Sequence, residues 1–187
     1  SKYLNIWICD LSTTSGGGMV LGYAYLPGLQ SNLWRDGLVV DFQYFGTIGI
    51  AAPSSDGRTA THEIGHYLGL NHTFAEERNG WGQDPCTDPQ GNIQCCDRDD
   101  LNVNDTPPTN EVYWNLVNNS VPSISSNSYN SCNDLQYGFS FDRPDMHENY
   151  MSYAANTWMF TNDQVNVMYA TLNGYRSSLK NSNVTMN

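Results

Sequence analysis

Residues 62–72 read His-Glu-Ile-Gly-His-Tyr-Leu-Gly-Leu-Asn-His and hold most of the information about fold and chemistry. His62 and His66 are four residues apart, so on a helix they project from one face about one turn apart. Both imidazoles can therefore bind one tetrahedral metal ion. Gly69 can adopt a positive φ, which would end the helix and let His72 return as a third ligand. Three protein ligands leave one position for water, as in catalytic zinc sites.

Glu63 follows the first of these histidines and is not itself expected to bind the metal. Its carboxylate could reach a water molecule at the open position and act as a general base. The opposing interpretation is a helix with incidental surface histidines. The whole chain has 4 His, and three of them fall within these eleven residues, which favours a metal site.

The composition limits the possible classes of protein. A chain of 187 residues is long enough for one domain with a real core, and two lobes flanking a cleft are expected. Its net charge of −11 would repel a polyanion, and no basic stripe is present, so nucleic acid is not an expected partner. Charged residues make up only 14%, while Asn, Ser, Thr and Tyr are abundant, which favours a secreted protein.

The five cysteines also favour an oxidising compartment. Cys9 lies in the apolar run 4–9 and is predicted to be a buried free thiol. Four cysteines follow the histidine motif in a loop-rich region and predict one or two disulfides with three possible pairings: Cys86, Cys95, Cys96 and Cys132. A second metal site is less favoured, because no Cys-x-x-Cys spacing occurs.

Strands are predicted over residues 3–9, 19–25 and 37–45, where β-forming residues are concentrated. The turn at 54–57 can cap a helix running from about Arg58 to Leu68. Residues 74–150 read as a long loop, and apolar periodicity predicts a final helix that starts at Thr161 or Asn162 and ends near Leu179. The sequence shows no signal peptide and no apolar run that could span a bilayer, so a mature or excised form is expected.

Several further motifs carry a family resemblance. The string Asn149-Tyr150-Met151-Ser152-Tyr153 resembles the methionine turn of the metzincin zinc endopeptidases, in which Met151 would lie beneath the metal. Within that group the chain resembles the pappalysin family through four stretches in the same order, namely residues 22–28, 73–74, 103–107 and 159–164.

The resemblance implies an α+β, metzincin-like fold for one catalytic domain spanning residues 1–187. An upper lobe of about 1–72 would hold a twisted mixed sheet and the active-site helix. An irregular lower lobe of about 73–187 would hold the Met-turn and the C-terminal helix. A protein or peptide substrate would cross the cleft and pair with an edge strand of the upper lobe. We expect a monomer with no membrane span.

The resemblance also implies roles for individual residues. Zn²⁺ would be held by the three histidines of the motif, with Glu63 as the base. Tyr153 resembles a tyrosine that assists near the zinc, although a packed tyrosine remains the alternative. Structural Ca²⁺ is implied near the Asp-Thr-Pro loop, where Asp100, Asn104 and Thr106 offer oxygen donors, unless these residues merely solvate a loop.

The chain departs from the family pattern in three places. The strand and long helix that usually precede the segment 4–9 are not seen, and Trp158 stands near the place of a family cysteine. Residues 154–158 contain no acid, whereas some family members use an aspartate there to select basic residues. We therefore expect a more apolar or mixed preference at that pocket.

Two alternatives compete with a secreted zinc endopeptidase. One is a peptide-binding or adhesive module with a vestigial metal site, and the intact Glu63 argues against it because a binding module needs no general base. The other is a different metzincin family with the same chemistry. The Val-Asn-Asp-Thr-Pro string at 103–107 favours the pappalysins instead.

Overall fold

The computed structural model describes residues 3–11, 20–29, 33–51, 56–74, 96, 103–110, 113, 129–155 and 157–181. The chain forms two compact units. Unit 1 comprises residues 1–70 and 166–187, and unit 2 comprises residues 71–165.

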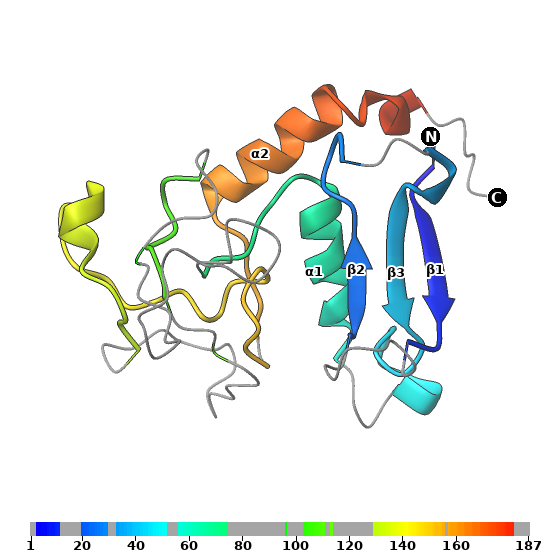
Figure 1. Cartoon of the computed structure of the whole chain (residues 1–187), viewed down its shortest axis with the longest axis horizontal. Helices are drawn as coiled ribbons and strands as arrows, with labels where there is room; N and C mark the ends of the chain where they lie inside the picture. Colours follow the sequence, from blue (N-terminus) through cyan, green and yellow to red (C-terminus); the bar gives the residue numbers. More distant parts are fainter. Residues whose placement is uncertain are drawn as a thin grey trace, which may run out of the picture. The chain divides into compact units, whose positions relative to one another are not determined.

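Unit 1 contains a mixed three-stranded sheet. β3 (Gly37–Asp41) lies in the centre, between β1 (Asn5–Cys9) and β2 (Gly22–Ala24), as Figure 1 shows. β1 pairs with β3 in parallel and β2 pairs with β3 in antiparallel fashion. The mixed sheet agrees with the predicted α+β class, but all three strands are shorter than predicted.

The end of β3 explains why it is shorter than the predicted strand 37–45. The Asp41 side chain accepts hydrogen bonds from the backbone N–H groups of Leu11 at 2.8 Å and Gln43 at 2.9 Å. The backbone of Tyr44 then donates to the Asp41 carbonyl at 2.9 Å, which closes a turn. An aspartate that bonds to the backbone two residues ahead favours such a turn over a continued strand.

Burial differs sharply across the sheet. Leu38 and Val40 of the central strand are fully buried, and the helix Arg58–Tyr67 packs against this strand. On the edge strand β1, by contrast, Ile6 and Ile8 are exposed, and so is the free thiol of Cys9. The prediction that Cys9 is free is confirmed and the prediction that it is buried is wrong. The apolar run predicted a strand correctly, but an apolar sequence does not reveal an edge position.

The helix α1 (Arg58–Tyr67) packs beside β2 and β3 (Figure 1). Its boundaries agree with the prediction to within one residue. Gly57 takes the N-cap position with φ of 80°, and the Asp56 carboxylate accepts a hydrogen bond from the Arg58 N–H at 3.0 Å. Tyr67 is 2% exposed and forms part of the unit's core.

The C-terminal segment is broken where a single helix was predicted. α2 (Asn162–Asn173) ends before Gly174, and the short 3₁₀ helix η4 (Ser177–Asn181) follows. The chain from Asn166 onward belongs to unit 1, whereas the predicted lower lobe contained the whole helix. The contacts of Arg176 account for this difference.

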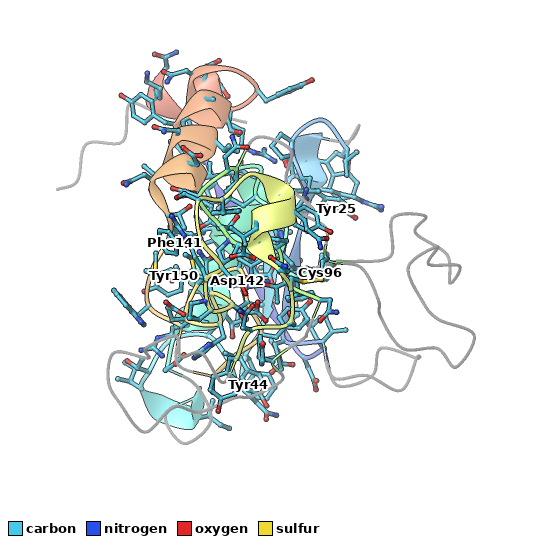
Figure 2. All side chains as sticks on the ribbon, turned by 90° about the vertical axis from the view of Figure 1, so that its left-hand side faces the viewer. Tyr25, Tyr44, Cys96, Phe141, Asp142 and Tyr150 are labelled. Carbon is cyan, nitrogen blue, oxygen red and sulfur yellow. A yellow bond between two sulfur atoms is a disulfide. The ribbon has the colours of Figure 1, made fainter. Side chains whose placement is uncertain are left out.

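Arg176 is a buried cation that joins several elements of unit 1. Its Nε donates to the Tyr67 carbonyl at 2.6 Å, and its Nη2 donates to the carbonyl of Tyr25, which is labelled in Figure 2, at 3.1 Å. Its Nη1 forms an ion pair with the buried carboxylate of Asp36. The guanidinium carbon also lies 3.4 Å from the Tyr67 ring centroid. One side chain thus ties the C-terminal segment to the ends of β2, β3 and α1.

The described part of unit 2 is mostly irregular and contains many polar contacts. Its described regular structure consists of the 3₁₀ helix η3 (Asp134–Tyr137), the first residues of α2 and one bridge between Asn149 and Met159. The disulfide Cys96–Cys132 confirms that cysteines after the histidine motif pair. The other two cysteines of the predicted set, Cys86 and Cys95, lie outside the described residues.

Buried carboxylates are the most unusual feature of this unit. Asp134 and Asp145 are fully buried, and the nearby Asp142 (Figure 2) accepts from the Asp134 N–H at 3.0 Å. Burial raises the pKa of both Asp134 and Asp145.

In the described part of the chain, no helix has the length and apolarity needed to cross a membrane.

Candidate zinc site

The C-terminal turn of α1 sets up the site. Gly69 has φ of 98°, its N–H donates to the His66 carbonyl at 2.9 Å, and the Leu70 N–H donates to the Gly65 carbonyl at 3.0 Å. This pair of bonds, with glycine in the left-handed region, is a Schellman motif. Leu70 is fully buried and anchors the turn. The predicted role of Gly69 in ending the helix is confirmed.

Three imidazoles converge within this short stretch of chain. One ring nitrogen from each of His62, His66 and His72 lies within 4.8 Å of the others. The two Nε2 atoms of His62 and His66 are 3.1 Å apart. Two nitrogens bound to a tetrahedral zinc ion at about 2.0–2.1 Å lie about 3.3 Å apart. The donor set and its spacing therefore fit zinc.

The orientation of His66 is fixed by the turn that follows it. Its Nδ1 lies 2.7 Å from the Leu70 carbonyl, so Nδ1 carries the hydrogen and Nε2 keeps its lone pair. Burial lowers the pKa of His66, against the opposing effect of the hydrogen bond to Leu70. Neutral imidazole is the form that binds a metal, and the pKa lowered by burial favours that form. The hydrogen bond to Leu70 contributes differently, because it holds the hydrogen on Nδ1 and leaves Nε2 free to bind.

Glu63 lies beside the histidines on α1 and is 5% exposed. Its Oε2 is buried with no hydrogen-bond partner among the described residues, and burial raises its pKa to about 8. A divalent cation held by three neutral imidazoles would favour the ionised carboxylate. An unsatisfied buried oxygen next to a metal site has the properties required of a proton acceptor.

Comparison with known proteins identifies the family. Residues 1–173 match the peptidase family model described as pregnancy-associated plasma protein-A. The chain belongs to the pappalysin family of metallopeptidases. Membership implies zinc, which agrees with the three-histidine site.

Curated relatives and a solved structure resemble this pappalysin chain over different spans. An extracellular metalloprotease of Arthroderma otae is 38% identical over 95 residues, which cover 48% of this chain and 28% of the relative. A second Arthroderma otae extracellular metalloprotease is 31% identical over 142 residues, which cover 72% of this chain and 44% of the relative. Mature mirolysin of Tannerella forsythia, solved with a cleaved peptide, has a TM-score of 0.64 and 33% identity, covering 95% of this chain and 56% of its own. The chain thus spans less than half the length of these curated relatives.

In this pappalysin chain, the third histidine of the candidate site, His72, packs in a cluster with the rings of Phe74 and Tyr153, which also lie 4.9 Å from each other. The ring of Phe74 stacks on His72 with centroids 4.7 Å apart and an interplanar angle of 10°. Tyr153 meets the same imidazole edge-on, also at 4.7 Å. This packing restricts the His72 ring. It also brings together His72, which was predicted from the histidine motif, and Tyr153, which was predicted from the Met-turn resemblance.

Met151 occupies a tight turn in unit 2. The Ser152 N–H donates to the Asn149 carbonyl at 2.9 Å, and the Met151 N–H donates to the Asn149 side chain at 2.9 Å. Met151 is fully buried, and its carbonyl accepts from the Thr73 N–H at 3.2 Å. The chain just after the third histidine is therefore joined to the turn that carries this methionine.

The residues predicted to bind calcium are only partly described. Asp100 lies outside the described residues. The Asn104 N–H donates to the Asp163 carboxylate at 3.0 Å, and the Asp163 N–H donates to Asp105 at 2.9 Å. Thr106 is buried, and one carboxylate oxygen of Asp105 is buried without a partner. Among the described residues, the three histidines are the only group of His, Cys, Asp or Glu with metal-binding spacing.

Three contacts at the site were not predicted from the sequence. They are the Leu70 carbonyl on His66, the Phe74 ring on His72 and the close approach of Gly22 to Glu63. The first could have been found, because Gly69 at the C′ position predicts a Schellman turn. The other two depend on ring orientation and strand placement, for which the sequence carries no local signal.

Proposed function

We propose that this chain is the catalytic domain of a secreted zinc endopeptidase that hydrolyses peptide bonds in proteins. The observation that carries the proposal is the convergence of three imidazoles beside a buried, unpartnered glutamate on the same helix. The extracellular metalloproteases among its relatives support both the activity and secretion.

A zinc ion at this site would supply a Lewis acid for the scissile carbonyl and would lower the pKa of a water molecule to about 7. His62, His66 and His72 would hold it. Glu63 accepts the proton of the attacking water through its buried carboxylate and then delivers it to the leaving amine. Glu63 is buried, so little bulk water reaches its carboxylate, and the electrostatic interactions of that carboxylate with the metal and the proton are stronger as a result.

Two residues of unit 2 receive supporting roles in this proposal. Tyr153 is a candidate donor of a hydrogen bond to the oxyanion, supported by its edge contact with the His72 ring. Met151 is the candidate Met-turn methionine, supported by its burial in a tight turn. Its role would be to support the ligands rather than to perform chemistry.

The substrate would be an extended protein or peptide segment. Among the described strands, β2 is an edge strand of the sheet and packs on α1, the helix that carries Glu63. A peptide can add to such an edge through backbone hydrogen bonds. Residues 154–158 carry no acid, so the pocket preference we propose is apolar or mixed rather than basic. The domain would act as a monomer.

Structural calcium is also proposed, near Asn104 and Thr106 with Asp100. The support is chemical, because these residues and the neighbouring Asp105 offer hard oxygen donors. One Asp105 oxygen is buried without a partner, which a cation could satisfy.

The test is to digest a denatured proteome with zinc-loaded wild type and with Glu63→Ala, each with and without a zinc chelator, and to map the cleaved bonds. Cleavage should require both zinc and Glu63, while zinc content should be the same in the two proteins. Normal turnover by Glu63→Ala would show that another residue is the base. Consistent cleavage before Arg or Lys would refute the proposed pocket preference.

A further inference from the structure

Gly22 leaves no room for a side chain between β2 and Glu63. A Cβ atom built on Gly22 would lie 3.0 Å from both Cγ and Oε1 of Glu63, and 3.0 Å from the Val39 carbonyl oxygen. Contacts at this distance are tighter than nine in ten Cβ contacts in proteins, so a neighbouring atom would have to move by a few tenths of an ångström. The backbone of the edge strand therefore lies directly against the glutamate.

The backbone conformation does not require glycine at this position. Gly22 is absent from the residues with positive φ, so an L-amino acid could adopt its extended geometry. Glycine also weakens the interior of a strand because it loses more conformational entropy on folding. The feature that requires glycine here is the space that the Glu63 side chain occupies.

The face of β2 that packs on α1 is lined by small residues. Gly22 and Ala24 are half-buried, whereas Tyr23 between them is 45% exposed on the opposite face. Small residues let the strand and helix approach closely, since both backbones can then come into near contact. This close packing of β2 on α1 determines where the Glu63 carboxylate lies relative to the strand edge.

We propose that Gly22 is a positioning residue for Glu63: by having no side chain, it lets the carboxylate occupy the space beneath the strand edge. The inference rests on the proposed role of Glu63 as general base. A methyl group at position 22 would meet one movable neighbour, Glu63, and one fixed neighbour, the Val39 carbonyl. The glutamate would be displaced while the three histidines stay in place.

The kinetic test compares zinc-loaded wild type with Gly22→Ala. Zinc affinity, measured by competition with a chelator, should stay within about twofold, because no ligand is touched. KM should change little, and kcat should fall about 10- to 100-fold, as expected when a catalytic group is misplaced by a fraction of an ångström. Unchanged kcat with unchanged zinc affinity would overturn the inference.

A second test uses the metal-free protein and needs no activity. Thermal unfolding is measured for wild type, Gly22→Ala, Glu63→Ala and the double variant. Because Glu63→Ala removes the crowded atoms, the loss of Tm caused by Gly22→Ala should be smaller in the double variant. Equal losses in both backgrounds would show that Gly22 does not act through Glu63.

Gly174→Ala is the matched control in the same unit. Its Cβ would also meet a backbone carbonyl, that of Ala170 at 3.2 Å, but has no contact with Glu63. It should show no coupling to Glu63→Ala and no change in kcat. A zinc-loaded wild type that cleaves nothing would refute the proposed function, whereas an additive thermal cycle would refute the positioning role, so the two failures are distinguishable.

Discussion

The side-chain amides of Asn149 and Gln164 bond to each other in both directions. Asn149 Nδ2 donates to Gln164 Oε1 at 2.7 Å, and Gln164 Nε2 donates to Asn149 Oδ1 at 3.1 Å. Gln164 also accepts from the Thr161 N–H, while Thr161 Oγ1 accepts from the Gln164 N–H, which is a capping box at the start of α2. The pair therefore links the N-terminus of a helix to the turn that carries Met151.

Gln164→Glu should destabilise the protein by about 1–3 kcal/mol. A carboxylate oxygen would replace the Nε2 donor, so the hydrogen bond from residue 164 to the buried Asn149 Oδ1 would be lost. Urea unfolding gives the free-energy difference. Gln136→Glu, at an exposed position, is the control and should change stability by less than about 0.5 kcal/mol. Equal effects at the two positions would contradict the importance of the amide pair.

His66→Ala should abolish zinc-dependent stabilisation. Free zinc at 1,000 times the Kd stabilises a native protein by about 4 kcal/mol, so the Tm of wild type should rise with zinc concentration. The variant should show a Tm independent of zinc. His147→Gln is the matched control, because this buried histidine lies outside the triad and its loss should leave the zinc dependence intact. A zinc-dependent Tm in His66→Ala would remove this residue from the ligand set.

Arg176→Met should cost about 3–5 kcal/mol, because the buried carboxylate of Asp36 would lose its only cation partner among the described contacts. The double variant Asp36→Asn/Arg176→Met should recover part of this loss, as chemical unfolding would show. Arg35→Met removes an exposed arginine that lies over the Trp34 ring, and it should have a small effect. No recovery in the double variant would mean that the hydrogen bonds of Arg176, rather than its ion pair, dominate.

Asp145 should make stability depend on pH. Burial raises its pKa above the ordinary value of 3.8, against hydrogen bonds from Ser131 and Tyr113 that lower it. Because the folded state holds the proton more tightly, the contribution of Asp145 to stability is complete below pH 3.8 and is lost as pH rises through the folded pKa. Asp145→Asn cannot ionise, so it should lose less stability over this pH range.

The measurement for Asp145 is urea unfolding at a series of pH values from acid to neutral. The quantity of interest is the difference between wild type and Asp145→Asn, which should change with pH. Parallel pH profiles for wild type and Asp145→Asn would contradict the prediction.

Replacing Cys96 and Cys132 by serine should cost about 3–4 kcal/mol, as expected for a loop with a sequence separation of 36 residues. Thermal unfolding of the double variant should show a lower Tm, and reducing agent should then have little further effect through this bond. Cys9→Ser removes an exposed free thiol and should leave the Tm unchanged. An equal Tm for wild type and the double serine variant would show that the disulfide does not stabilise the protein.

The local elements of the site could be predicted from the sequence because their causes are local. The helix from Arg58, the turn at Gly69 and the three histidines all lie within fifteen consecutive positions, and helical periodicity and glycine conformation determine them. The capping box at Thr161 follows from a spacing of three residues in the same way. Such patterns need no knowledge of what packs against them.

Only the tertiary structure decided which distant residues meet. Arg176 reaches Asp36 across 140 positions, and it draws the C-terminal segment into unit 1 against the predicted division. Cys9 lies in a strand that was predicted correctly, yet it is exposed because β1 is at the sheet's edge. The sequence by itself determined the three histidines, the neighbouring glutamate and the helix that carries His62, Glu63 and His66. Strand order, burial and the fit of Gly22 against Glu63 arise from packing between segments far apart in the chain, and packing has no local sequence period.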